Sequence, residues 1–61
     1  MKTKFIIYSE KDKCYVISEK KFTEEKEFAK KFESIGEAMK IASTIMENTK
    51  NKDYKVYPIY N

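Results

Sequence analysis

The chain has 61 residues, with 13 basic and 10 acidic side chains and a formal net charge of +3. A chain of this length forms one domain, residues 1–61, and buries only about 60% of the surface that its unfolded form exposes. With one cysteine and no histidine, it is expected to have no internal disulfide, metal or other cofactor, and to complete its core by close packing or self-association.

Two β-strands are predicted near the N-terminus. Residues 3–9 and 14–18 are rich in β-branched and aromatic side chains, which favour strands. The four residues between them, 10–13, are all charged, and four residues is an ordinary length for a hairpin connection. Because this connection has no glycine, we expect a type I turn rather than a tight primed turn.

Residues 19–33 have two interpretations. Thr23 is followed by two glutamates, an arrangement typical of the first turn of a helix. Phe28 and Phe32 are four residues apart, which suits one face of a helix and equally one face of a strand. We expect a loop or helical turn over 23–27 and a short third strand near 29–33.

A helix is predicted over residues 35–49. Ser34 and Glu37 have the spacing of a capping box, in which the serine hydroxyl accepts from a free backbone amide at the helix start. At the other end, Asn48 or Asn51 is expected to take the left-handed conformation that ends many helices. One apolar stripe follows the helical spacing and consists of Ile35, Ala38, Met39, Ala42, Ile45, Met46 and Thr49.

A last strand is predicted over residues 54–60, where aromatic and aliphatic side chains alternate with others. Pro58 has no N–H to donate, so it is expected on an edge strand or at a strand end. The fold class is therefore α+β: a small, mostly antiparallel sheet of three to four strands, in the order β-β-(β)-α-β, with one amphipathic helix packed on one face.

The predicted strands carry apolar or aromatic side chains on both faces, although one helix covers only one face and a solvated face should be polar. Because tyrosine and phenylalanine are enriched in interface cores, the second face predicts a surface for a partner protein or a homodimer. Tyrosines that half-cover an open sheet are the alternative. The expected contact residues are the tyrosines Tyr8, Tyr15, Tyr57 and Tyr60 and the lysines Lys4, Lys13 and Lys55.

The residue types argue against an enzyme. Histidine, the commonest general base, is absent. Gly36 is the one glycine, so the chain has no glycine-rich phosphate loop. Cys14 has no histidine to activate it, and we expect it to be a small buried apolar residue in a strand. The function is therefore expected to be binding.

Single-stranded nucleic acid is the second hypothesis for the partner. Aromatic side chains on an open sheet, with lysines around them, can stack bases. All 13 basic residues are lysine, and the missing arginine is the residue that recognises phosphate and guanine by a bidentate fork. The third hypothesis is a structural subunit of a larger assembly.

The chain is expected in a cytosol, either that of a bacterium or that of a phage's host. No stretch reaches the roughly 18 consecutive apolar residues of a membrane helix, so no membrane partner is expected. The N-terminus begins like a signal peptide, but its apolar run is too short. A single cysteine suits a reducing compartment.

The stretch Lys31–Ala42, Lys-Phe-Glu-Ser-Ile-Gly-Glu-Ala-Met-Lys-Ile-Ala, followed by the strand Tyr54–Ile59, resembles a pattern common in small proteins of phages and prophages of Gram-positive bacteria. In those proteins a hairpin precedes a phenylalanine–serine helix start, an alanine-spaced helix and a final strand. Some of them are stoichiometric inhibitors of host defence systems, including anti-CRISPR proteins. The resemblance implies a small protein-binding modulator and carries over no functional residue.

Overall fold

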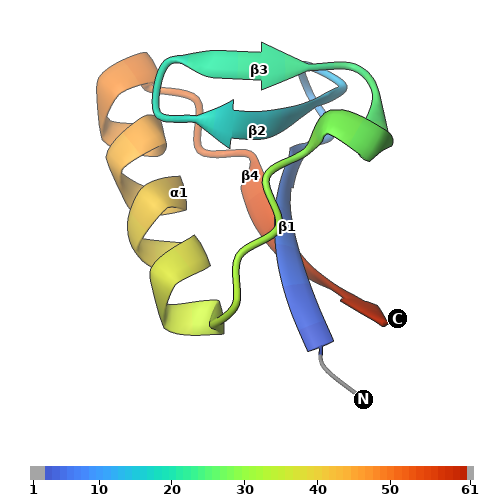
Figure 1. Ribbon diagram of the computed structural model, residues 1–61. Helices are drawn as coiled ribbons and strands as arrows, with labels where there is room; N and C mark the ends of the chain where they lie inside the picture. The colour runs from blue at the N-terminus through green and yellow to red at the C-terminus, as the bar shows by residue number, and fades with distance from the viewer. Residues whose placement is uncertain (1–2, 61) are drawn as a thin grey trace.

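The computed structural model describes residues 3–60, which form one four-stranded antiparallel sheet and one α-helix. The order across the sheet is β3-β2-β1-β4, so the first strand is central and pairs with the last (Figure 1). The predicted α+β class, with one helix packed against the strands, is confirmed. The elements are β1 (Thr3–Ser9), β2 (Cys14–Ser18), β3 (Lys21–Thr23), the 3-10 helix η1 (Lys26–Phe28), α1 (Ile35–Thr49) and β4 (Tyr54–Tyr60).

The charged segment 10–13 is the turn of a β1–β2 hairpin, in which Ser9 lies opposite Cys14. Lys13 has a φ of 53° and is the one residue of this turn in the left-handed region. A type I′ turn needs positive φ at both central residues, so the turn is not of that type, as predicted. A polar residue here tolerates a conformation that usually favours glycine.

Local interactions determine where α1 begins and ends. The Ser34 hydroxyl accepts from the backbone amide of Glu37 at 3.2 Å, which confirms the predicted N-cap. At the other end the left-handed residue is Lys50, with a φ of 60°. The prediction of Asn48 or Asn51 for this position was wrong, because the helix ends at the residue directly before Lys50.

The core lies between α1 and one face of the sheet. The predicted helical stripe was too wide: Ile35 is 53% exposed, Met39 is 55% exposed, and Thr49 is also exposed. Ile35 and Met39 lie along a groove between α1 and the edge strand β4, where no further strand covers them. The buried cluster consists of Ile7, Val16, Phe32, Ala38, Ala42, Ile45 and Tyr54.

The segment between β2 and α1 differs from the prediction. The third strand is β3, Lys21–Thr23, and not residues 29–33. The predicted helical turn over 23–27 is η1, which lies slightly later, at Lys26–Phe28. Phe32 is buried while Phe28 is 66% exposed, so the two phenylalanines share neither a strand face nor a helix face.

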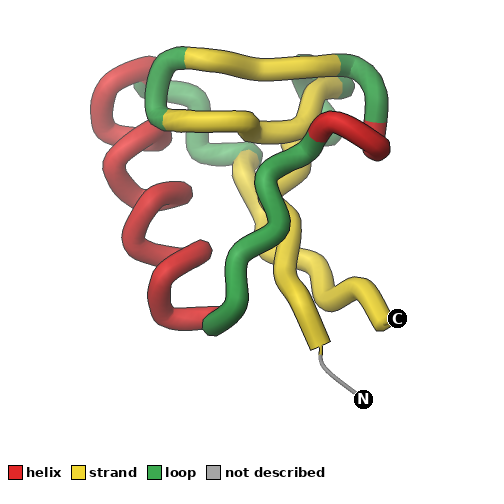
Figure 2. Tube along the Cα trace, viewed as in Figure 1, coloured by secondary structure: helices red, strands yellow, loops and turns green. Residues whose placement is uncertain are grey.

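Residues 29–33 instead run alongside β1 as a loop (Figure 2). Phe32 and Phe5 exchange two backbone hydrogen bonds, of 2.8 and 2.7 Å. The amide of Lys30 donates to the carbonyl of Val16 at 2.9 Å. The loop therefore satisfies backbone groups of β1 and β2 that these two strands do not satisfy with each other.

Both edges of the sheet are protected against pairing with another strand. The β3 edge is three residues long and includes a lysine. On the β4 edge, Pro58 lies opposite Phe5, whose own N–H and C=O both bond to Phe32 on the far side. Pro58 is therefore at a position whose backbone groups face outward, where its missing N–H interrupts the free edge.

Candidate functional site

Three tyrosines lie side by side on the face of the sheet that α1 does not cover. Tyr8 is opposite Tyr15 on β2, and Tyr57 on β4 is opposite Ile6, the residue that shares the Tyr8 face of β1. The ring centroids of Tyr8 and Tyr15 are 4.7 Å apart, and those of Tyr8 and Tyr57 are 6.3 Å apart. We call this surface the open face; with these tyrosines it includes Ile6 and Ile59.

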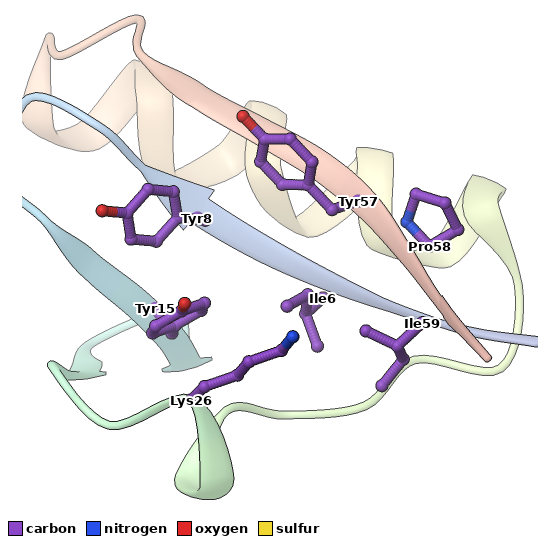
Figure 3. Close-up of a pocket in the computed structure, with 7 residues that line it drawn as sticks. All are labelled: Ile6, Tyr8, Tyr15, Lys26, Tyr57, Pro58 and Ile59. Atoms are coloured by element: carbon purple, nitrogen blue, oxygen red, sulfur yellow. The ribbon is translucent and has the colours of Figure 1, made fainter. Parts of the chain in front are cut away.

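The open face is hollowed into a groove of about 390 Å³. Ile6 is 3% exposed and lies between Tyr15 and Ile59, and Ile59 continues the apolar lining toward the end of β4 (Figure 3). Lys26 extends from η1 into this space, so the 3-10 helix forms a wall that the strands alone do not supply. The lining residues are Ile6, Tyr8, Tyr15, Lys26, Tyr57, Pro58 and Ile59.

The fourth predicted tyrosine lies elsewhere. Tyr60 is 75% exposed and lies opposite Thr3 at the end of β4. Because successive side chains of a strand point to opposite faces, Tyr60 does not share the face of Ile59. It is absent from the groove lining, so the four tyrosines predicted as contact residues do not all share one face.

The three predicted lysines have different surroundings. Lys55 is opposite Tyr8 and shares the open face. Lys4 forms an ion pair with Glu33 at 3.1 Å, so its charge is largely compensated. Lys13 is in the β1–β2 turn and does not line the groove. The sequence did not identify Lys26 as a site residue, because its place beside the groove depends on how the chain folds back after β3.

The hydroxyl of Tyr57 donates to the Glu10 carboxylate at 3.3 Å. Burial raises the pKa of Tyr57, and the neighbouring negative charge of Glu10 raises it further. The phenol therefore stays neutral and serves as a hydrogen-bond donor. Its carboxylate partner comes from the β1–β2 turn, so one acidic side chain at the rim of the open face is already engaged.

A polar cluster ties the β1–β2 turn to the α1–β4 connection. Asn51 donates to Asp12 at 2.8 Å, and the amide of Lys11 donates to Asp53. Ser9, which is fully buried, accepts from the amide of Asp12 at 3.2 Å. The hydrogen bonds of Asn51 and Asp53 cross from one loop to the other, and that of Ser9 lies within the β1–β2 turn. The cluster therefore holds the two loops together.

Cys14 and Tyr54 lie next to this cluster. Burial raises the pKa of the Cys14 thiol, and the charge of Asp12 raises it further. The thiol is therefore protonated near neutral pH and a poor nucleophile. Burial is also the main cause that raises the pKa of Tyr54 to about 12. Within residues 3–60 no three His, Cys, Asp or Glu side chains are arranged to hold a metal ion.

No protein-family model matches the chain, and neither a curated protein nor a solved structure matches it. In the described part of the chain, no helix combines the length and the apolar character needed to cross a membrane.

Proposed function

We propose that the chain is a non-enzymatic protein-binding module that uses the open face for contact. The observation that carries this proposal is the groove on the sheet face that α1 leaves uncovered, which Tyr8, Tyr15 and Tyr57 line together with the buried side chain of Ile6. Tyrosine is enriched in interface cores because it brings a large contact area with few rotatable bonds. A surface of this kind suits contact with a partner protein through the open face.

The sheet edges support the same conclusion. Addition of a strand to a sheet edge is a common mode of peptide recognition, and it needs a row of free backbone groups. Here β3 is short and the free side of β4 is interrupted at Pro58. The contact is therefore made through side chains of the open face and not by extension of the sheet.

The resemblance to small phage proteins extends this proposal to a biological class. On that ground alone, the partner is a protein of a host defence system and the chain is its stoichiometric inhibitor. If the chain is instead a structural subunit, it would bind its partner just as stably, but that partner would be a component of the same assembly. Identification of the partner separates these roles.

The test is retrieval of partners from a bacterial lysate by the tagged full chain, with and without nuclease. A double variant, Tyr15→Thr with Tyr57→Thr, removes two rings while threonine keeps a high strand propensity. The matched control, Ile35→Gln with Met39→Gln, changes the exposed groove beside α1 and keeps its helix propensity close to the wild type.

We expect a stoichiometric protein partner that survives nuclease, that the tyrosine variant loses and that the control variant keeps. Far-ultraviolet circular dichroism of both variants checks that each is folded. Loss of the partner in the control variant alone would move the contact to the groove beside α1 and refute the open face as the binding surface.

Single-stranded nucleic acid is the second candidate ligand, because the same tyrosines lie near two lysines, Lys26 and Lys55. The arrangement of the rings favours it less: Tyr8 packs against Tyr15 at 4.7 Å, which leaves less ring surface for a base. Salt distinguishes the two ligands. Affinity for a nucleic acid falls steeply between low and physiological salt, whereas an apolar protein contact changes little.

A further inference from the structure

Two lysines beside the open-face groove form no ion pair within the described residues, although the Glu10 carboxylate also lies at this rim. Lys26 lines the groove from η1, and Lys55, opposite Tyr8 on the edge strand β4, shares the open face but lies outside the groove lining. Between residues 3 and 60, the one ion pair within 4.0 Å joins Lys4 to Glu33, so neither rim lysine has a carboxylate partner. The two cations come from different elements, η1 and β4, on the face that carries one apolar hollow.

The floor of the groove has the opposite character. Ile6 is 3% exposed and Ile59 is half-buried, so the lining below the rim is aliphatic. The hydroxyls of Tyr8 and Tyr15 make no hydrogen bond within the part of the chain that the structure describes, and they are available at the rim. An apolar side chain suits this floor, and a carboxylate beside it suits the lysines and the phenols.

A second copy of the chain matches this surface poorly. In a two-fold contact each open face meets the same face, which brings the rim lysines of both copies to one interface. Glu10, which accepts from Tyr57, keeps its negative charge and offsets only part of this repulsion. Like charges in a desolvated contact are costly. The charge distribution therefore favours a different molecule that is acidic.

A nucleic acid is also acidic, but the floor discriminates against it. Bases bind by stacking on exposed ring faces, and here the ring of Tyr8 contacts those of both Tyr15 and Tyr57. The most buried lining residue is Ile6, with a branched aliphatic side chain. Such a floor accommodates a leucine-like or phenylalanine-like side chain better than a sugar–phosphate chain.

From these observations we infer that the groove binds an acidic protein segment, in which an apolar side chain enters the hollow over Ile6 and neighbouring carboxylates contact Lys26 and Lys55. This inference rests on the proposed protein-binding function and specifies the chemistry of its partner. The contact is a groove–segment interaction in which the charges steer the encounter and the apolar side chain supplies the anchor.

The test uses short random peptides displayed on phage and selected on the immobilised full chain. Selected peptides are then synthesised, and their affinities are measured against three proteins. These are the wild type, a rim variant with Lys26→Glu and Lys55→Glu, and a control variant with Lys20→Glu and Lys40→Glu. The control changes the net charge equally, at exposed positions outside the groove lining. Homopolymeric single-stranded DNA is measured alongside as the competing ligand.

We expect the selected peptides to share an apolar residue with acidic neighbours. The rim variant should bind them about ten-fold more weakly, and the control should bind them within about two-fold of the wild type. Neutral or basic peptides, equal losses in both variants, or no enriched sequence would each overturn the inference. So would single-stranded DNA that binds more tightly than any peptide. In the case of no enriched sequence, the proposed function still has its own test, because retrieval of a folded partner and its loss in the tyrosine variant do not depend on peptide selection.

Discussion

Replacement of Asn51 by alanine is expected to destabilise the fold through loss of the contacts between two loops. The Asn51 amide nitrogen donates to the Asp12 carboxylate at 2.8 Å, and its side-chain oxygen accepts from the amide of Asp53 at 3.0 Å. A third contact, to the Ser9 hydroxyl at 3.4 Å, is long and contributes little. The substitution therefore removes one charge-assisted hydrogen bond and one local hydrogen bond.

The expected loss is about 1.5 kcal/mol. Hydrogen bonds to a charged group contribute about 1.5–3 kcal/mol and neutral ones about 0.5–1.5 kcal/mol. The sum is reduced because Asp12 is exposed and water can replace the asparagine. For a domain of this size, a loss of about 1.5 kcal/mol lowers Tm by about 6–12 °C. A chain of this length has a total stability of only about 3–9 kcal/mol, so the effect is readily measured.

The assay is thermal and denaturant unfolding followed by far-ultraviolet circular dichroism, with Asn48→Ala as the matched control. Asn48 is exposed on α1, where alanine is a better helix former, so the control should equal or slightly exceed the wild type in stability. If Asn51→Ala unfolds within about 0.5 kcal/mol of the control, the loops are held by something other than this side chain, and the reasoning is refuted.

Three other predictions test the core, the helix cap and a buried phenol. Ile45→Ala, at a fully buried position, should lower the free energy of unfolding by about 2–5 kcal/mol in denaturant. The control Met39→Ala should change it by less than about 0.5 kcal/mol, because Met39 is 55% exposed. Equal effects would contradict the position of the core. Ser34→Ala should cost about 1 kcal/mol through loss of the hydrogen bond from Glu37, and Ser43→Ala, at an exposed helix position, is the control that should cost nothing. Because the folded state raises the pKa of Tyr54 from 10 to about 12, the protonated phenol stabilises the fold fully below about pH 10. This stabilisation, about 3 kcal/mol, is lost as the pH rises through 12. Tyr54→Phe should abolish this loss and remove the latest phase of tyrosinate absorbance in a spectroscopic titration, and an unchanged late phase would show that another phenol is responsible.

The elements with strong local signals could be predicted from the sequence. The strands at 3–9, 14–18 and 54–60 and the helix at 35–49 have the predicted bounds, because β-branched runs, a charged turn and a serine cap each act within a few residues. Residues 19–33 could not be predicted in the same way. Their structure depends on backbone hydrogen bonds to distant strands, such as the pair that joins Phe32 to Phe5, and no local pattern records such a bond.

The candidate site shows the same division. Alternation along the strands was sufficient to bring Tyr8, Tyr15 and Tyr57 to one face, and strand register then made them neighbours. The sequence did not reveal that Ile6 would be almost fully buried on that face, nor that Lys26 would stand beside it. Both results follow from the position of η1 relative to the sheet, which is a property of the folded chain as a whole.

The pairing of β1 with β4 has a consequence for the order in which the protein is made. Of the described strands, β1 is synthesised first and lies inside the sheet, and along its whole length, from Thr3 opposite Tyr60 to Ser9 opposite Tyr54, it pairs with β4, the last of them to be synthesised. While the chain is still growing on the ribosome, the β1–β2 hairpin has no neighbour on its other side, and a lone hairpin is marginally stable in water. Folding of this sheet is therefore expected to be a single event that waits until β4 has left the ribosome, and a ribosome stalled before Tyr54 would hold an unfolded nascent chain that is sensitive to protease.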